Sequence, residues 1–192
     1  MSKPSNAITV GIKIFGMQLF AALISVLFMG TFSNFISSNT GMKIYSTITA
    51  GIFLGFYYSE IWNAGKKDAK HVKVYNKHHE DSISLCYSKC LIMALVAIVP
   101  NIIALIALAI ASSTGNGWIT TNIIYRVIQS PFFGWLGNDN FTYVPNCVII
   151  TFIPPLFAFP AYITGTKEFS LIEKYLPKIV YKNKNKNKKN KR

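Results

Sequence analysis

The sequence predicts an all-α integral membrane protein, a four-helix bundle of two antiparallel transmembrane hairpins with an interfacial helix in its outer loop. Three stretches, 14–42, 90–125 and 140–166, contain no charged residue, and a fourth, 44–59, ends at Glu60. Crossing the hydrocarbon core of a bilayer takes about 20 helical residues. Charged residues make up only 14% of the chain, against about 25% in soluble domains. Lipid is therefore the expected environment of these helices.

The predicted transmembrane helices follow from these stretches and from the residues that flank them. They cover residues 14–36, 44–64, 90–111 and 143–164. Together they form one membrane domain at 14–166, after a short N-terminal segment at 1–13 and before a basic tail at 167–192. The turn at 37–41 is short and polar, so the first two helices should be antiparallel neighbours.

The distribution of positive charge predicts the orientation. Of the 20 Lys and Arg residues, only Lys43 and Arg126 fall on one side of the predicted helices. Positively charged residues near membrane helices are retained in the cytoplasm. We therefore expect both termini and the loop 65–89 in the cytoplasm, and the loop 112–142 outside.

The outer loop contains an amphipathic segment, 118–137. Its apolar residues recur at helical spacing, and they are Ile119, Ile123, Ile124, Val127, Ile128, Phe132 and Phe133. Polar residues such as Asn122 and Arg126 share the opposite face, and Pro131 and Gly134 should end the helix. This pattern favours a lid that lies in the membrane interface with its apolar face toward lipid. The alternative is a gate or a re-entrant element.

The predicted fourth helix is rich in proline. Pro145 lies in its first turn, where the missing N–H costs little. Pro154, Pro155 and Pro160 are interior, and each frees a backbone carbonyl and bends the helix. Broken helices line polar paths in transporters, although proline is also common in membrane helices generally. Pro154 and Pro155 are therefore candidate pathway residues.

Asn101 is a second kind of candidate, because it lies in the middle of the third predicted helix. Its side-chain amide needs a hydrogen-bond partner inside the bundle. We expect that partner to be a carbonyl freed at Pro154 or Pro155. A structural role in joining helices is favoured over a role in transport.

Glu60 is the charged residue closest to membrane depth, one turn from the predicted inner surface. Charged groups at depth are costly and mark functional sites in many membrane proteins. The interpretation favoured here is that Glu60 reaches the interface or pairs with Lys66 or Lys67.

No sequence pattern indicates catalysis or a cofactor. Nucleotide-binding loops, catalytic triads and metalloprotease motifs are not found. His78, His79, Cys86 and Cys90 are the residues that zinc would need, but they lack the closely paired spacing of a zinc site. The sequence therefore predicts no metal and no cofactor, and an enzyme is the least favoured class.

Basic residues flank the predicted membrane domain on the cytoplasmic side. Clusters of this kind attract anionic lipid headgroups, at about 1 kcal/mol per charge. The predicted headgroup contacts are Lys66, Lys67, Lys174, Lys178 and Lys182. No nucleic-acid partner is expected, because nothing in the tail would stack on bases.

Two predicted helices leave the membrane through similar residues, Gly65-Lys66-Lys67-Asp68 and Gly165-Thr166-Lys167-Glu168. We interpret both glycines as helix ends placed before interfacial lysines; a pair of repeated hairpins is the alternative.

The same region carries a resemblance. The pattern is Trp62-x-x-Gly65-x-Lys67-Asp68, followed by Gly165-x-Lys167, Ser170-Leu171-x-Glu173-Lys174 and Val180-Tyr181-Lys182. It resembles a group of small four-helix membrane proteins of clostridia and related low-GC bacteria. The resemblance covers the ends of two helices, and it implies a bacterial plasma membrane without implying an activity.

The leading functional hypothesis is an accessory or regulatory membrane subunit that acts through partners, either another membrane subunit or copies of itself. The spacing Gly51-x-x-x-Gly55 permits close helix approach in such an assembly. The alternative is a small transporter or channel protomer that works as an oligomer. Its path would follow Glu60, Asn101, Pro154 and Pro155.

Overall fold

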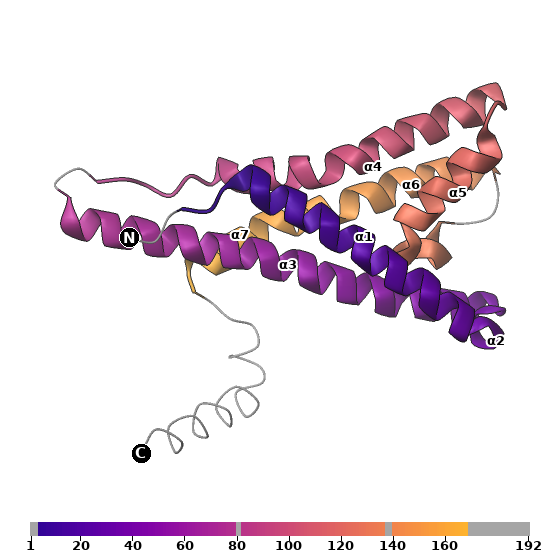
Figure 1. The fold of residues 1–192 in the computed structure, drawn as a ribbon, viewed down its shortest axis with the longest axis horizontal. Helices are drawn as coiled ribbons and strands as arrows, with labels where there is room; N and C mark the ends of the chain where they lie inside the picture. Colours follow the sequence, from indigo (N-terminus) through magenta and orange to yellow (C-terminus); the bar gives the residue numbers. More distant parts are fainter. Residues whose placement is uncertain (1–3, 80–81, 137–139, 169–192) are drawn as a thin grey trace, which may run out of the picture.

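The computed structural model describes residues 4–79, 82–136 and 140–168, and in these residues every regular element is a helix (Figure 1). Three helical stretches are long and apolar enough to cross a membrane, and they are Ala7–Thr31, Ser88–Thr114 and Val144–Thr166. The prediction of an all-helical protein is therefore confirmed for the described residues, and three stretches have the length and hydropathy that crossing a membrane requires. The predicted headgroup contacts in the tail, Lys174, Lys178 and Lys182, lie outside the described residues.

The first helix, α1, covers Ala7–Thr31, and the short α2 covers Ser33–Ile36. The helix begins seven residues before the predicted membrane span 14–36. The side chain of Asn6 caps it by accepting hydrogen bonds from the backbone N–H groups of Ile8 and Thr9.

The third helix, α3, covers Asn39–His78 and has 40 residues. Such a helix is about 60 Å long, about twice the hydrocarbon thickness of a bilayer. The predicted helix 44–64 lies within it, but the prediction that a loop begins at Gly65 is wrong, because the helix continues through residues 65–78. This last part of α3, residues 65–78, is called its second half below, and residues 39–64 its first half. The second half extends beyond the other helices at one end of the molecule (Figure 1).

The next elements are α4 at Ser88–Thr114, α5 at Trp118–Ile128 and a 3₁₀ helix, η1, at Ser130–Trp135. α4 contains the predicted helix 90–111 and ends where Gly115 adopts a left-handed conformation, with φ of 72°. α5 ends before Pro131, as the sequence predicts.

α5 and η1 behave differently. α5 exposes Ile119, Ile123 and Ile124, as a lipid-facing lid requires. η1 instead turns inward and buries Phe132 against α3. Its Gly134 N–H donates to Ser46 Oγ over 2.6 Å. The expectation that Phe132 faces lipid is therefore wrong, because Ser130, Pro131 and Phe132 are buried where η1 packs against α3 and α1.

The proline-rich segment forms two helices, α6 at Asn140–Leu156 and α7 at Ala158–Thr166. The break falls at Phe157, whose N–H bonds to the Pro154 carbonyl over 3.0 Å. Pro160 cannot donate to the Leu156 carbonyl, so a continuous helix would lose that bond. Starting a new helix places Pro160 in a first turn, where the missing N–H costs little.

α3 and α7 cross at two glycines. A Cβ atom added to Gly65 would lie 2.5 Å from the Tyr162 carbonyl oxygen, and one added to Gly165 would overlap the Trp62 carbonyl. These glycines are therefore sites of close helix approach, and the interpretation of Gly65 as a helix end is wrong. Beside the crossing, the Tyr58 hydroxyl and Thr164 Oγ1 share a hydrogen bond.

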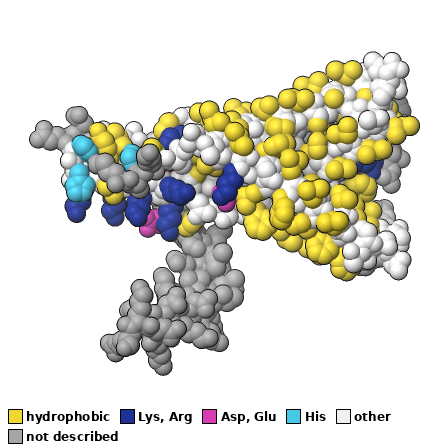
Figure 2. Space-filling model, viewed as in Figure 1, with side chains coloured by type: hydrophobic (Ala, Val, Ile, Leu, Met, Phe, Trp, Pro, Cys, Tyr) yellow, Lys and Arg dark blue, Asp and Glu magenta, His cyan; other side chains and the backbone are white. Residues whose placement is uncertain are grey.

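The helices close into a ring at this crossing, because α3 contacts α1 and α7, and α4 contacts α1 and α6. Away from the crossing they diverge, and α5 and η1 occupy the space between them (Figure 1). We call the narrow end, near residues 65–89, the basic end, and the other the wide end. In Figure 2, Lys and His side chains gather at the basic end, and apolar side chains predominate over the middle of the face shown.

We expect Gly165→Ala to destabilise the bundle by about 1–3 kcal/mol, because the added methyl group forces α3 and α7 apart. Unfolding in mild detergent, followed by circular dichroism, measures the effect. Gly55→Ala is the matched control. A Cβ at Gly55 has no neighbour within 4 Å, so stability should be unchanged or rise by up to about 1 kcal/mol. Equal changes of stability in Gly165→Ala and Gly55→Ala would contradict the close approach of α3 and α7 at Gly165.

Candidate functional site

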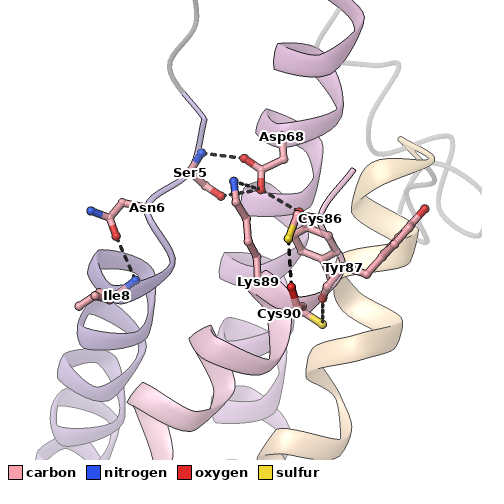
Figure 3. A network of polar contacts seen from close by, with 10 residues as sticks. Ser5, Asn6, Ile8, Asp68, Cys86, Tyr87, Lys89 and Cys90 are labelled. Carbon is pink, nitrogen blue, oxygen red and sulfur yellow. Dashed lines mark hydrogen bonds and ion pairs between the residues drawn. The ribbon is translucent and has the colours of Figure 1, made fainter. Parts of the chain in front are cut away.

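The most connected polar group of the basic end is the carboxylate of Asp68, which faces into the bundle from α3 (Figure 3). Its Oδ1 accepts the Ser5 N–H over 2.7 Å. Its Oδ2 accepts the Ser5 hydroxyl over 2.8 Å, the Tyr162 hydroxyl over 2.8 Å and the Lys89 ammonium over 3.3 Å. One side chain thus joins the N-terminal segment, α3, α4 and α7.

The surroundings of Asp68 favour its ionised form. Burial by itself raises the pKa of this carboxyl group, but the hydrogen bonds from Ser5 and Tyr162 and the charge of Lys89 outweigh burial and lower the pKa below its ordinary value. Both carboxylate oxygens are already engaged, so the group is poorly placed to accept a proton from a substrate. Its geometry is that of a structural lock between four segments.

A second polar centre lies in the middle of the bundle, where Gln18 of α1 meets Asn101 of α4. Gln18 Nε2 donates to Asn101 Oδ1 over 3.1 Å, and Asn101 Nδ2 donates to Gln18 Oε1 over 2.8 Å. Both side chains are buried. The expectation that Asn101 bonds a carbonyl freed by proline is therefore wrong, because Asn101 instead exchanges two hydrogen bonds with the Gln18 amide.

The amide pair lines a small cavity together with Tyr57, Pro154 and Pro155. Its water-accessible volume is about 10 Å³, roughly the space that one buried water needs. The Tyr57 hydroxyl is buried, without a hydrogen-bond partner among the described residues. The structure thus brings Asn101, Pro154 and Pro155 together, as the predicted pathway requires, but around a space too narrow to pass a solute.

Glu60 does not join this group. Its carboxylate pairs with the Lys13 ammonium over 2.8 Å, so the expected pairing with Lys66 or Lys67 is wrong. The reason is the length of α1, which begins early enough to place Lys13 beside α3. Lys66 instead lies over the ring of Trp62, 5.0 Å from its centre. Lys66 and Lys67 are exposed at the basic end, and their contact with lipid stays a prediction.

Sequence reasoning missed Asp68 and Gln18 as site residues. Asp68 stands among lysines, so it resembles an ordinary solvated charge, although it is one of the few acidic residues near the predicted membrane surface. Gln18 interrupts an apolar helix much as Asn101 does, and two such amides on different helices are a usable signal for a pair. In the described part of the chain, no three His, Cys, Asp or Glu side chains are grouped to hold a metal ion.

The arrangement defines a class, an all-helical protein whose helices are joined by buried polar contacts and include three stretches long and apolar enough to cross a membrane. Comparison with protein-family models, curated proteins and solved structures gave no match.

We expect Asp68→Asn to lower the free energy of unfolding by about 1–3 kcal/mol at neutral pH, because an amide NH₂ group then faces donors. The pKa of Asp68 is lowered from 3.8 on folding, so its stabilisation is complete above that value and is lost as the pH falls through the folded-state pKa. The difference in unfolding free energy between wild type and Asp68→Asn should therefore disappear in strong acid. Unfolding measured against pH tests both expectations.

Glu60→Gln is the matched control for Asp68→Asn, since it makes the same chemical change on the same helix. Its partner Lys13 is 59% exposed, so the cost should stay below about 1 kcal/mol. An equal loss of unfolding free energy in both variants would argue against a structural role of the Asp68 carboxylate. So would a difference in unfolding free energy between wild type and Asp68→Asn that persists in strong acid.

We expect Asn101→Leu and Gln18→Leu each to cost about 1–2 kcal/mol, because each leaves one buried amide unpaired. The double variant should cost no more than either single one, since it removes both polar groups together. Unfolding titrations of the four proteins give the coupling energy. Strictly additive losses would show that the two amides do not depend on each other.

Proposed function

We propose that this chain is a multi-pass protein of a bacterial plasma membrane that acts as an accessory or regulatory subunit through a partner protein. Four segments cross the bilayer: α1, the first half of α3, α4, and α6 with α7. Four crossings put both ends of the chain on one side, and the asymmetry of lysine and arginine makes that side the cytoplasm.

The membrane placement of the first half of α3 is supported by its outward face. Ile44, Ile48, Ile52 and Phe56 are spaced by four residues and are between 47% and 58% exposed. A stripe of this kind is costly in water and favourable in lipid. The opposite side of the same segment packs on α1, η1 and α7, so this half of α3 is an integral part of the bundle.

The observation that carries the functional proposal is the lysine stripe of the second half of α3. Lys66, Lys70, Lys73 and Lys77 follow at helical intervals, and with about 100° per residue they fall within about 60° of one another. All four are exposed. Asp68 points the other way, into the bundle. The helix thus presents a row of positive charge on the side that does not pack.

The direction of α3 favours a protein partner over a lipid surface for the far part of the stripe. The helix is continuous from Asn39 to His78, so its second half continues along the axis of its membrane half. Lys77 lies 12 residues beyond Gly65, about 18 Å along that axis. The surface potential of a membrane falls off within a Debye length, about 8–10 Å. Lys66 remains near the headgroups, while Lys73 and Lys77 face the cytoplasm.

A partner for this stripe presents acidic side chains along a groove or a helix. Complementary charge of this kind speeds association and fixes orientation. The transporter alternative has less support, since the cavity at Asn101 holds about one water molecule and Glu60 pairs with Lys13 away from that cavity.

We expect the triple reversal Lys70→Glu, Lys73→Glu, Lys77→Glu to remove a foreign subunit that purifies with the wild-type chain in mild detergent. The reversal turns attraction into repulsion across the contact. The triple change of the same residues to Arg is the matched control, because it keeps the charge and should retain the subunit. The mass and stoichiometry of the purified complex measure both results.

Salt should weaken the wild-type complex, since exposed charges are screened. A partner that survives the charge reversal would contradict the role of the stripe. A homo-oligomer without any foreign subunit, with a liposome flux that changes in Asn101→Leu or Glu60→Gln, would instead support the transporter.

A further inference from the structure

An apolar groove opens between α3 and α6 at the wide end of the molecule, directly beside η1. Its walls include Gly51 and Leu54 of α3, Ile149 and Ile153 of α6, and Trp135 of η1. The volume is about 510 Å³, within the range of sites that bind small molecules. The groove exists because α3 packs on α7 at the crossing but diverges from α6 beyond it.

The lining does not suit water. The polar side chains of the lining are Asn146 and Thr47, and the Thr47 hydroxyl already donates to the Lys43 carbonyl over 2.8 Å. A buried or half-buried water needs two to four polar partners, and the aliphatic and aromatic residues that make up the rest of the lining supply none. The groove therefore suits an apolar occupant.

The length of the groove selects among apolar occupants. From Thr47 to Leu54 it runs along eight residues of α3, a rise of about 10 Å, and one turn beyond Leu54 the hydrogen bond between Tyr58 and Thr164 joins α3 to α7. A transmembrane helix, from a partner or from a second copy, would need contact along a core of about 30 Å. One acyl chain occupies a single leaflet, about half that thickness.

A positively charged residue precedes the groove on α3. Lys43 lies one helical turn before Thr47 and two turns before Gly51, on the same face of α3. Its side chain is exposed. Lys43 and Arg126 are the two basic residues that the sequence assigns to the outer side. A cation at this position is complementary to a phosphate at the membrane surface.

We propose that this groove binds one acyl chain of an outer-leaflet phospholipid, with the lipid phosphate held at Lys43. The site combines an apolar slot one leaflet deep with a single cation at its rim. The inference rests on the proposed membrane placement of the first half of α3, and it does not depend on the cytoplasmic partner of the lysine stripe.

Fluorescence of Trp135 reports on the occupant, because this side chain lines the groove. The protein carries Trp62→Phe and Trp118→Phe, so that Trp135 is its single tryptophan, and it is kept in micelles of mild detergent. A phosphatidylglycerol with brominated acyl chains is added in small molar ratios. We expect quenching that saturates near one lipid per chain, and one retained lipid in the native mass spectrum.

Gly51→Leu and Gly55→Leu form the matched pair. A Cβ at either position has no neighbour within 4 Å, but only Gly51 lines the groove. Gly51→Leu should weaken lipid binding about tenfold, since its side chain displaces methylene groups of the acyl chain, and Gly55→Leu should leave it unchanged. Thr47→Phe, at the rim, provides a second blocking variant.

Lys43→Gln tests the phosphate contact. It should weaken binding of the brominated phosphatidylglycerol severalfold and leave binding of a brominated diacylglycerol, which has no phosphate, unchanged. Circular dichroism establishes that each variant is folded.

Saturable quenching that is the same in folded Gly51→Leu and in wild type would overturn the proposal. So would a dimer that dissociates in Gly51→Leu, since the groove would then hold a second copy of the chain. The two proposals can fail separately. If the lysine-stripe variants lose the foreign subunit but still bind lipid, lipid binding in the groove does not depend on the partner. If Gly51→Leu loses lipid binding but retains the subunit, partner binding does not depend on the groove.

Discussion

The close approach of α3 and α7 at Gly65 and Gly165 is the constraint from which the rest of the arrangement follows. Each glycine lies against a backbone carbonyl of the other helix, so the two axes meet where any side chain would hold them apart. The contact places Asp68 and Tyr162 within hydrogen-bond distance. Because two crossing helices must separate on either side of their contact, the same approach opens the space that η1 and the apolar groove occupy.

Two groups of buried polar side chains in this bundle are joined across helices. The Asp68 carboxylate receives donors from three other segments, and the Gln18 and Asn101 amides satisfy each other. In a setting without water, an unpaired polar group is costly, so each pair fixes which helices are neighbours. These contacts specify one packing among the many that apolar helices permit, and they leave little polar surface for transport chemistry.

The long α3 connects the two proposed activities of the molecule. Its first half belongs to the bundle and borders the apolar groove, and its second half carries the lysine stripe beyond the bundle. Under the two proposals, a lipid near Gly51 and a partner near Lys73 contact the same continuous helix, so a change of tilt caused by one reaches the other.

The sequence by itself determined the helical class, the apolar segments and the gathering of lysines, because solvation and charge act on each segment locally. It also located Asn101, Pro154 and Pro155, which do meet. Tertiary structure alone decided the partners, such as Lys13 for Glu60 and Gln18 for Asn101, since these depend on which distant faces pack together. The same holds for Gly65, which looks like a helix end in the sequence and acts as a contact surface once α7 lies against it.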